Sequence, residues 1–282
     1  MNWSNIREGE LKELLNALQE AFTALGIDYY MIGAVAREIW FSRGDKKFRR
    51  TNDVDFAAFV GNQEQYAAIR QYLKEKKGFQ ETKTNSFVLI TPNGMQVDIL
   101  PFGGIEMDGT VKVEGIGLTN INVNGLMEVY TAGTEPVTLD TGHQFQVASL
   151  PSIVLLKLIA FDDRPEVRQK DVRDIGNLIA NYFELQADLI YEQHVDLFSV
   201  DDDAFREQSL QELAAIVIGR EIKKIIQQNS GLLQRVKSIV ENFLAQKEES
   251  VFVRQVVQET NQPVSEILKW LTKLLGGLQG ST

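Results

Sequence analysis

Three aspartates in two apolar runs are the residues of this chain best suited to chemistry. Asp53 and Asp55 stand one residue apart, and Asp98 lies in a second run further along. Side chains on a strand alternate between its faces, so Asp53 and Asp55 share one face while Val54 and Phe56 can be buried on the other. Carboxylate oxygens favour Mg²⁺ or Mn²⁺. The pattern predicts a metal-dependent phosphoryl-transfer enzyme.

Phosphoryl transfer explains why three acids would be needed. Two metal ions about 3.5–4 Å apart can stabilise both the attacking and the leaving oxygen of an in-line displacement. We expect Asp53 and Asp55 to bind metal together with a triphosphate, and Asp98 to bind the metal beside the attacking hydroxyl and to be able to accept its proton. A single Asp-x-Asp is often only a pair of solvated acids at a strand end. The combination with a third acid and a glycine turn favours the metal site.

The glycine turn is Gly33-Ala34, which follows the apolar run 29–32. We predict a strand over 29–32 and a short helix over 34–41. A glycine at such a turn leaves room for phosphates, and the amides at a helix start are suitable anion donors. Gly33 is therefore a candidate nucleotide-binding residue.

The helices and strands that must position these residues belong to two predicted domains, with a boundary near residue 150. The first part, residues 1–149, mixes helical and strand patterns and predicts an α+β domain with a mixed sheet, whereas residues 150–282 predict a helical bundle domain. The predicted elements are a helix from Leu11 to Leu25 closed by Gly26, strands at 54–60, 86–90 and 95–100, a helix at 65–74, short strands and loops at 103–145, and helices at 151–160, 171–182, 210–218, 232–244 and 264–275, the last ending at Gly276-Gly277.

Composition limits the classes of protein that the chain can be. Its 282 residues carry a formal net charge of -10, which argues against a protein that coats nucleic acid by bulk electrostatics. Cysteine is absent, and the two histidines, His143 and His194, are far apart and receive no predicted role. No apolar stretch approaches the roughly 20 residues of a membrane span, and the start of the chain has no signal-peptide pattern. We expect a cytoplasmic protein with no membrane partner.

Together these residues resemble the nucleotidyltransferase superfamily with the DNA polymerase β-like fold, whose pattern is a Gly-Gly or Gly-Ser turn, Asp-x-Asp and a third Asp. The similarity is greatest to the branch of the AbiEii-type toxins of toxin–antitoxin systems. It spans roughly residues 28–180, and the stretches that carry it are 49–56, 156–164 and 170–175. The resemblance implies an NTP substrate such as ATP, a divalent metal and, for the toxin branch, an antitoxin partner.

The resemblance also implies roles for residues outside the three acids. Lys157 matches the basic residue that such enzymes direct at the triphosphate, and it counts with the acids as a catalytic candidate. Asp171 and Asp174 match acids of the family's following helix and are possible additional site residues. Gly33, Ala34, Arg49 and Thr51 fall in the nucleotide-binding motifs. Ala34 departs from the usual Gly or Ser, and the spacing from Gly33 to Asp53 exceeds that of shorter members.

Simpler explanations compete with several of these roles. Lys157 can snorkel to the surface from an apolar helix, and acids such as Asp171 and Asp174 favour a helix start. The basic loop 43–50 can receive phosphates of a nucleotide or of an acceptor, or can be a solvated loop. The run 201–203 of three aspartates is interpreted as a helix start or solvated loop, not a metal site.

The predicted reaction is the transfer of an NMP from an NTP to an acceptor hydroxyl, with release of pyrophosphate. The acceptor is RNA or protein if the chain acts as its toxin relatives do. It is a small molecule, of the aminoglycoside type, in the first alternative. In the second alternative the fold binds a nucleotide or a partner without turnover, although the presence of all three acids argues against this.

Overall fold

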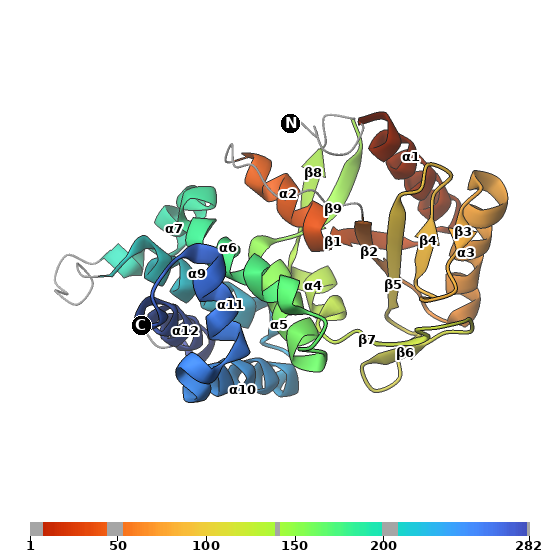
Figure 1. Cartoon of the computed structure of the whole chain (residues 1–282). Helices are drawn as coiled ribbons and strands as arrows, with labels where there is room; N and C mark the ends of the chain where they lie inside the picture. The colour runs from red at the N-terminus through yellow and green to blue at the C-terminus, as the bar shows by residue number, and fades with distance from the viewer. Residues whose placement is uncertain (1–7, 44–52, 139–141, 199–207, 281–282) are drawn as a thin grey trace. The chain divides into compact units, whose positions relative to one another are not determined.

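The computed structural model describes residues 8–43, 53–138, 142–198 and 208–280 (Figure 1). The chain divides into two compact units, Met1–Ser149 and Leu150–Thr282. The first unit contains a mixed β-sheet with helices, and the second contains only helices among its described residues. This confirms the predicted α+β class with a helical C-terminal region. That the first unit is the catalytic domain stays a prediction.

The first unit is built on a seven-stranded sheet in the order β3-β4-β5-β2-β1-β9-β8. The β1–β9 and β2–β5 pairs are parallel, and the other neighbours in this sheet are antiparallel. The elements of this unit are α1 (Glu8–Leu25), β1 (Asp28–Ile32), α2 (Gly33–Arg43), β2 (Asp53–Phe59), α3 (Gln63–Lys77), β3 (Gln80–Glu81), β4 (Val88–Ile90), β5 (Gln96–Phe102), β6 (Thr110–Lys112), β7 (Asn120–Asn122), α4 (Leu126–Ala132), β8 (Thr134–Thr138) and β9 (Gln144–Ala148).

The central strands β2 and β5 are buried on one face because apolar residues alternate with polar ones along them. In β2 the side chains of Val54 and Phe56 are fully buried, and the intervening Asp55 is half-buried. In β5 the side chains of Val97 and Ile99 are likewise fully buried. Each strand therefore places one apolar face in the core and leaves its polar residues on the opposite face. The predicted strand boundaries differ from the observed ones by one or two residues.

Helix α1 ends at Leu25, as predicted, whereas α3 is two residues longer at its start and three longer at its end than the predicted helix 65–74. Gly26, with φ of 62°, follows α1, and Gly78, with φ of 71°, caps α3 in the left-handed conformation. At the start of α3 the side chain of Asn62 accepts a hydrogen bond from the amide of Gln65 at 2.9 Å. These caps satisfy amides and carbonyls that a helix end leaves without partners.

The segment from 103 to 145 departs from its prediction in one element. It was predicted as short strands and loops, and β6, β7 and β8 fit this, but α4 is a helix. This helix has seven residues between Gly125 and Gly133, so it is too short to show a helical repeat in the sequence. Leu126 and Val129 of α4 are buried, and the Leu126 carbonyl accepts a hydrogen bond from the Tyr30 hydroxyl at 2.8 Å.

The second unit is a set of packed helices, as its continuous helical periodicity predicts. Ser209 caps one of them in a capping box with Glu212. The elements are α5 (Leu150–Asp163), α6 (Gln169–Leu185), α7 (Ala187–Gln193), the short 3₁₀ helix η1 (Val195–Phe198), α9 (Leu210–Ile226), α10 (Ser230–Gln246), the 3₁₀ helix η2 (Lys247–Glu249), α11 (Val251–Thr260) and α12 (Val264–Gln279).

The predicted end of the last helix at Gly276-Gly277 is wrong. Helix α12 continues to Gln279, and Gly280, with φ of 83°, is its cap. A Cβ atom on Gly277 would overlap the carbonyl oxygen of Ile216 in α9, and one on Gly219 of α9 would overlap the carbonyl oxygen of Leu274. These two glycines therefore let the backbones of α9 and α12 approach closely.

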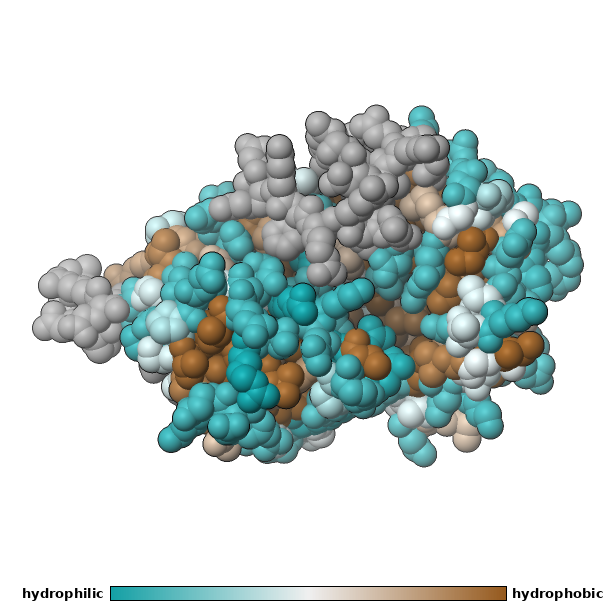
Figure 2. Space-filling model, in the orientation of Figure 1, coloured by the Kyte–Doolittle hydropathy of each residue, from teal (hydrophilic) through white to brown (hydrophobic). Residues whose placement is uncertain are grey.

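The surface is largely polar on the face that Figure 2 shows, where hydrophobic residues form only small groups. This agrees with a chain in which charged residues make up 24% of the sequence. Among the described residues, no helix combines the length and the apolar character needed to cross a membrane.

Candidate active site

The three aspartates lie on the same face of two neighbouring strands. Strands β2 and β5 are parallel, and Asp55 is the register partner of Asp98, while Asp53 is the partner of Gln96. Register partners in a sheet point to the same side, at a strand spacing of about 4.8 Å, and residues two apart on a strand do so too. All three aspartates are half-buried. The fold thus brings Asp98, distant in sequence, beside the Asp53–Asp55 pair.

Gly33 lies directly against this acidic face. Its φ is 70°, in the left-handed region, and a Cβ atom there would overlap Oδ2 of Asp55. A glycine is therefore required both by the backbone conformation and by the position of the Asp55 carboxylate. Ala34 follows in the first turn of α2 and is half-buried. The start of α2 and Asp55 are neighbours, as the predicted nucleotide site needs.

Gln96 is a polar neighbour that the sequence reasoning missed. Its amide Nε2 donates a hydrogen bond to Oδ1 of Asp98 at 2.8 Å. The signal was present, because Gln96 precedes Asp98 by two residues and so lies on the same face of the strand. Four polar residues thus share this face: Asp53, Asp55, Gln96 and Asp98.

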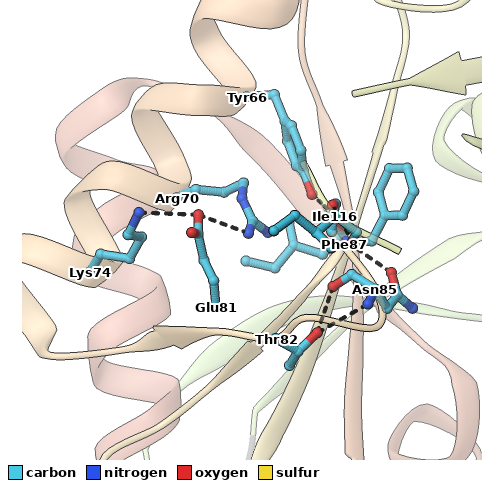
Figure 3. A network of polar contacts seen from close by, with 10 residues as sticks. Tyr66, Arg70, Lys74, Glu81, Thr82, Asn85, Phe87 and Ile116 are labelled. Atoms are coloured by element: carbon cyan, nitrogen blue, oxygen red, sulfur yellow. Dashed lines mark hydrogen bonds and ion pairs between the residues drawn. The ribbon is translucent and has the colours of Figure 1, made fainter. Parts of the chain in front are cut away.

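The opposite side of the sheet holds β5 in place beside Asp98. The hydroxyl of Tyr66 in α3 donates a hydrogen bond to the carbonyl of Ile99 at 2.9 Å. Burial raises the pKa of Tyr66 to about 12, so this hydroxyl keeps its proton over the physiological range. One turn further along α3, the side chains of Arg70 and Lys74 both contact Glu81 of β3, at 3.2 and 3.1 Å (Figure 3). Helix α3 is therefore tied to the strands on either side of β4.

The chemistry of the acidic face suits a hard divalent cation. Carboxylates of Asp55 and Asp98 lie side by side with Asp53 on the same face, and Gln96 adds a neutral amide. Within the described part of the chain, however, no three His, Asp or Glu side chains converge as a ready-made metal-binding cluster. The acids would have to turn toward a shared ion. The histidines are engaged elsewhere: His143 contacts Oδ1 of Asn16 at 2.7 Å, and His194 contacts Glu221 at 3.0 Å.

Lys157, Asp171 and Asp174 form a second cluster, within the helical unit. Nζ of Lys157 in α5 lies 2.6 Å from Oδ1 of Asp171 and 2.8 Å from Oδ2 of Asp174, both on α6. Burial by itself would lower the pKa of Lys157, but the two carboxylates outweigh it and raise that pKa. Lys157 has only 9% of its surface exposed, so the interpretation as a snorkelling surface lysine is wrong.

Several predicted positions lie outside the described residues. These are Arg49 and Thr51, most of the basic loop 43–50, and the aspartate run 201–203. At the edge of the loop, Arg43 is described, and its guanidinium lies 4.5 Å from the ring centroid of Trp40. This is a cation–π contact within α2.

One known protein family matches most of this chain. The family described as "Nucleotidyl transferase AbiEii toxin, Type IV TA system" matches residues 16–245, which is well over half of the chain. The chain belongs to this family. It is therefore a nucleotidyltransferase, and enzymes of this kind use an NTP and a divalent metal. The family is one of toxins from type IV toxin–antitoxin systems. No curated protein matches the sequence.

Two solved structures are similar to this nucleotidyltransferase. One is the antibiotic-resistance factor ANT(2'')-Ia in solution, with 12% identity and a TM-score of 0.38 over 57% of this chain and 76% of that one. The other is an antigenic nucleotidyltransferase-like protein from Paracoccidioides brasiliensis, with 16% identity and a TM-score of 0.41 over 82% of this chain and 93% of that one. The family match, and not these structures, supports the assignment.

Proposed function

We propose that this AbiEii-family nucleotidyltransferase moves an NMP from an NTP to an acceptor hydroxyl with Mg²⁺, or Mn²⁺, held by Asp53, Asp55 and Asp98. The observation that carries the proposal is the β2–β5 register, which pairs Asp55 with Asp98 and leaves Asp53 on the same face. When bound, the metal would neutralise charge on the triphosphate and on the leaving pyrophosphate.

The residues of the acidic face have separate roles in this proposal. Asp53 and Asp55 bind the metal that accompanies the triphosphate. Asp98 would complete the site for the metal beside the acceptor hydroxyl, and it can take the proton of that hydroxyl as the new phosphoester bond forms and pyrophosphate leaves. Gly33 leaves space beside Asp55. The amides at the start of α2, including that of Ala34, can donate to phosphate oxygens, as those of helix N-termini do.

Lys157 is proposed to contribute to triphosphate binding. An ammonium has three N–H donors, and two of them are used by Asp171 and Asp174, so the third can be donated to a phosphate oxygen. The two acids then act as positioning residues that fix the Lys157 ammonium. The proposal also includes Arg49 and Thr51 as nucleotide-binding residues.

The acceptor is proposed to be RNA or protein, because the family consists of toxins. On the same ground, the family match, we propose an antitoxin partner and a cytoplasmic location. A small hydroxylated acceptor, and a protein that binds nucleotide without turnover, are the competing outcomes of the experiment below.

The experiment is a labelling screen with α-³²P NTPs and Mg²⁺ across RNA, protein and metabolite fractions. Wild type should label one fraction and release pyrophosphate, and chelation of the metal should stop both. Asp53→Asn should lower the rate of transfer at least about 100-fold. Loss of a residue that only holds a metal ligand in place already lowers metal affinity or activity about 10- to 100-fold, and Asp53 is proposed to be a ligand itself.

The matched control is Asp108→Asn. Asp108 is an exposed aspartate of the same unit with φ of 51°, a conformation that asparagine tolerates, so this variant should transfer at the wild-type rate. Label that survives in Asp53→Asn would show that the metal assignment is wrong. Nucleotide-dependent thermal stabilisation without pyrophosphate release would instead identify a binding protein.

A further inference from the structure

The acidic face contains one polar side chain that is not an acid. Asp53, Asp55, Gln96 and Asp98 occupy two register pairs across β2 and β5, and each is half-buried. The alternate residues of both strands, Val54 and Val97 among them, are buried in the core. Gln96 is therefore held on the same side as the acids by the alternation of its strand and cannot turn to the other face without disrupting the core.

Gln96 donates a hydrogen bond to Asp98, the one of the three acids that lies on β5. Its Nε2 donates to Oδ1 of Asp98 at 2.8 Å. A hydrogen bond to a carboxylate is stronger than one between neutral groups, and it restricts rotation of the Asp98 carboxyl group about its Cβ–Cγ bond. The donor also carries no charge, so it orients Asp98 without adding a fourth anion to a face that already has three.

We propose that Gln96 is a positioning residue, which turns the Asp98 carboxylate toward the divalent cation without binding the substrate itself. This rests on the proposed function, since it requires the three acids to hold a metal. In enzymes whose metal ligands need an outer partner of this kind, its loss typically costs 10- to 100-fold in metal affinity. Loss of Gln96 should therefore weaken metal binding, and it should slow transfer only because less metal is bound.

The test measures Mn²⁺ binding alone, by electron paramagnetic resonance of the free ion, with no nucleotide present. Gln96→Met keeps the length of the side chain and removes its donor, so Mn²⁺ should bind about 10-fold more weakly. Gln144→Met is the control, because Gln144 is an exposed glutamine at the start of β9 in the same sheet, and it should bind Mn²⁺ as wild type does. Asp98→Asn provides the reference for loss of the third acid.

A second readout separates positioning from general damage. In the labelling assay, Gln96→Met should raise the Mg²⁺ concentration needed for half-maximal rate about 10-fold, while the rate at saturating Mg²⁺ stays near wild type. If Gln96→Met melts at a lower temperature than wild type in chelator, Gln96→Asn replaces it. That variant keeps an amide but is one methylene too short to reach Asp98, and the same loss of affinity is expected.

The outcomes distinguish this proposal from the proposed function. If wild type binds Mn²⁺, Asp98→Asn does not, and both Gln96 variants bind like wild type, the role of Gln96 is wrong and the metal site stands. If wild type binds no Mn²⁺, or Asp98→Asn binds it unchanged, the metal site itself is wrong and the role of Gln96 falls with it.

Discussion

At the scale of single residues, the position of Asp55 depends on a glycine in another element. Gly33 has φ of 70°, and any Cβ atom there would overlap Oδ2 of Asp55. Gly26 offers a natural comparison, because its φ of 62° is similar but no atom lies within 4 Å of where its Cβ would be. Both positions need a residue that tolerates a positive φ. At Gly33 a side chain would in addition collide with the Asp55 carboxylate.

Replacing each of these glycines by alanine should separate the two requirements. Both Gly26→Ala and Gly33→Ala place a side chain in the left-handed region, which costs about 1 kcal/mol of unfolding free energy, measured by urea denaturation. Gly33→Ala must in addition displace the Asp55 carboxylate. A shift of about 1 Å can cost about 100-fold in rate, so transfer should fall by that order in Gly33→Ala and remain near wild type in Gly26→Ala. Equal activity of the two variants would contradict the close contact between Gly33 and Asp55.

At the scale of elements, α5 and α6 are joined by a buried cation between two acids. Lys157 balances Asp171 and Asp174 where all three side chains have little contact with water. Removing one partner of a buried ion pair leaves uncompensated charge and costs about 3–5 kcal/mol. The raised pKa of Lys157 means that its contribution to stability is complete below its unfolded pKa and is lost only as pH rises through the folded value.

We therefore expect Lys157→Met to lower the unfolding free energy by about 3–5 kcal/mol at pH 7, because the buried cation that lies between Asp171 and Asp174 is lost. Lys269→Met is the control: Lys269 also pairs with an acid, Glu266, at 2.8 Å, but it is solvent-exposed, and no measurable change is expected. Chemical denaturation of both variants gives the comparison. Equal stability of Lys157→Met and wild type would mean that the α5–α6 ion cluster is not formed in solution.

The sequence predicts some elements better than others, for physical reasons. Strand alternation and helix caps are local, so the acid-bearing strands and the end of α1 at Gly26 could be predicted. Helix α4 is too short to show periodicity, and Gly277 looked like a helix end although it serves close packing against α9. The pairing of Asp55 with Asp98 depends on strand register and could be anticipated only as a shared site. The contacts of Lys157 with Asp171 and Asp174 depend on how α5 packs against α6, which a single sequence does not contain. The contact of Gln96 with Asp98 could have been found, because residues two apart on a strand share a face.

At the scale of the whole molecule, charge constrains how a toxin of this family could act. The chain carries 39 acidic and 29 basic residues, a formal net charge of -10. Such a chain is repelled by the phosphate backbone of nucleic acid, so tight non-specific coating of RNA or DNA is disfavoured. Turnover on a chosen acceptor, in which one molecule modifies many, is therefore the favoured route by which this chain would harm a cell.

Growth of a bacterial host therefore tests the toxin role through catalysis. Induced wild type should arrest growth, and Asp53→Asn, expressed to the same amount and with the same melting temperature, should be harmless because it no longer transfers. Asp108→Asn, which changes charge equally but lies at an exposed position outside β2 and β5, should arrest growth as wild type does. Co-expression of the protein encoded beside this chain should relieve the arrest. Arrest by Asp53→Asn would mean that binding and not transfer causes the harm, and harmless expression of a catalytically active wild type would refute the toxin role.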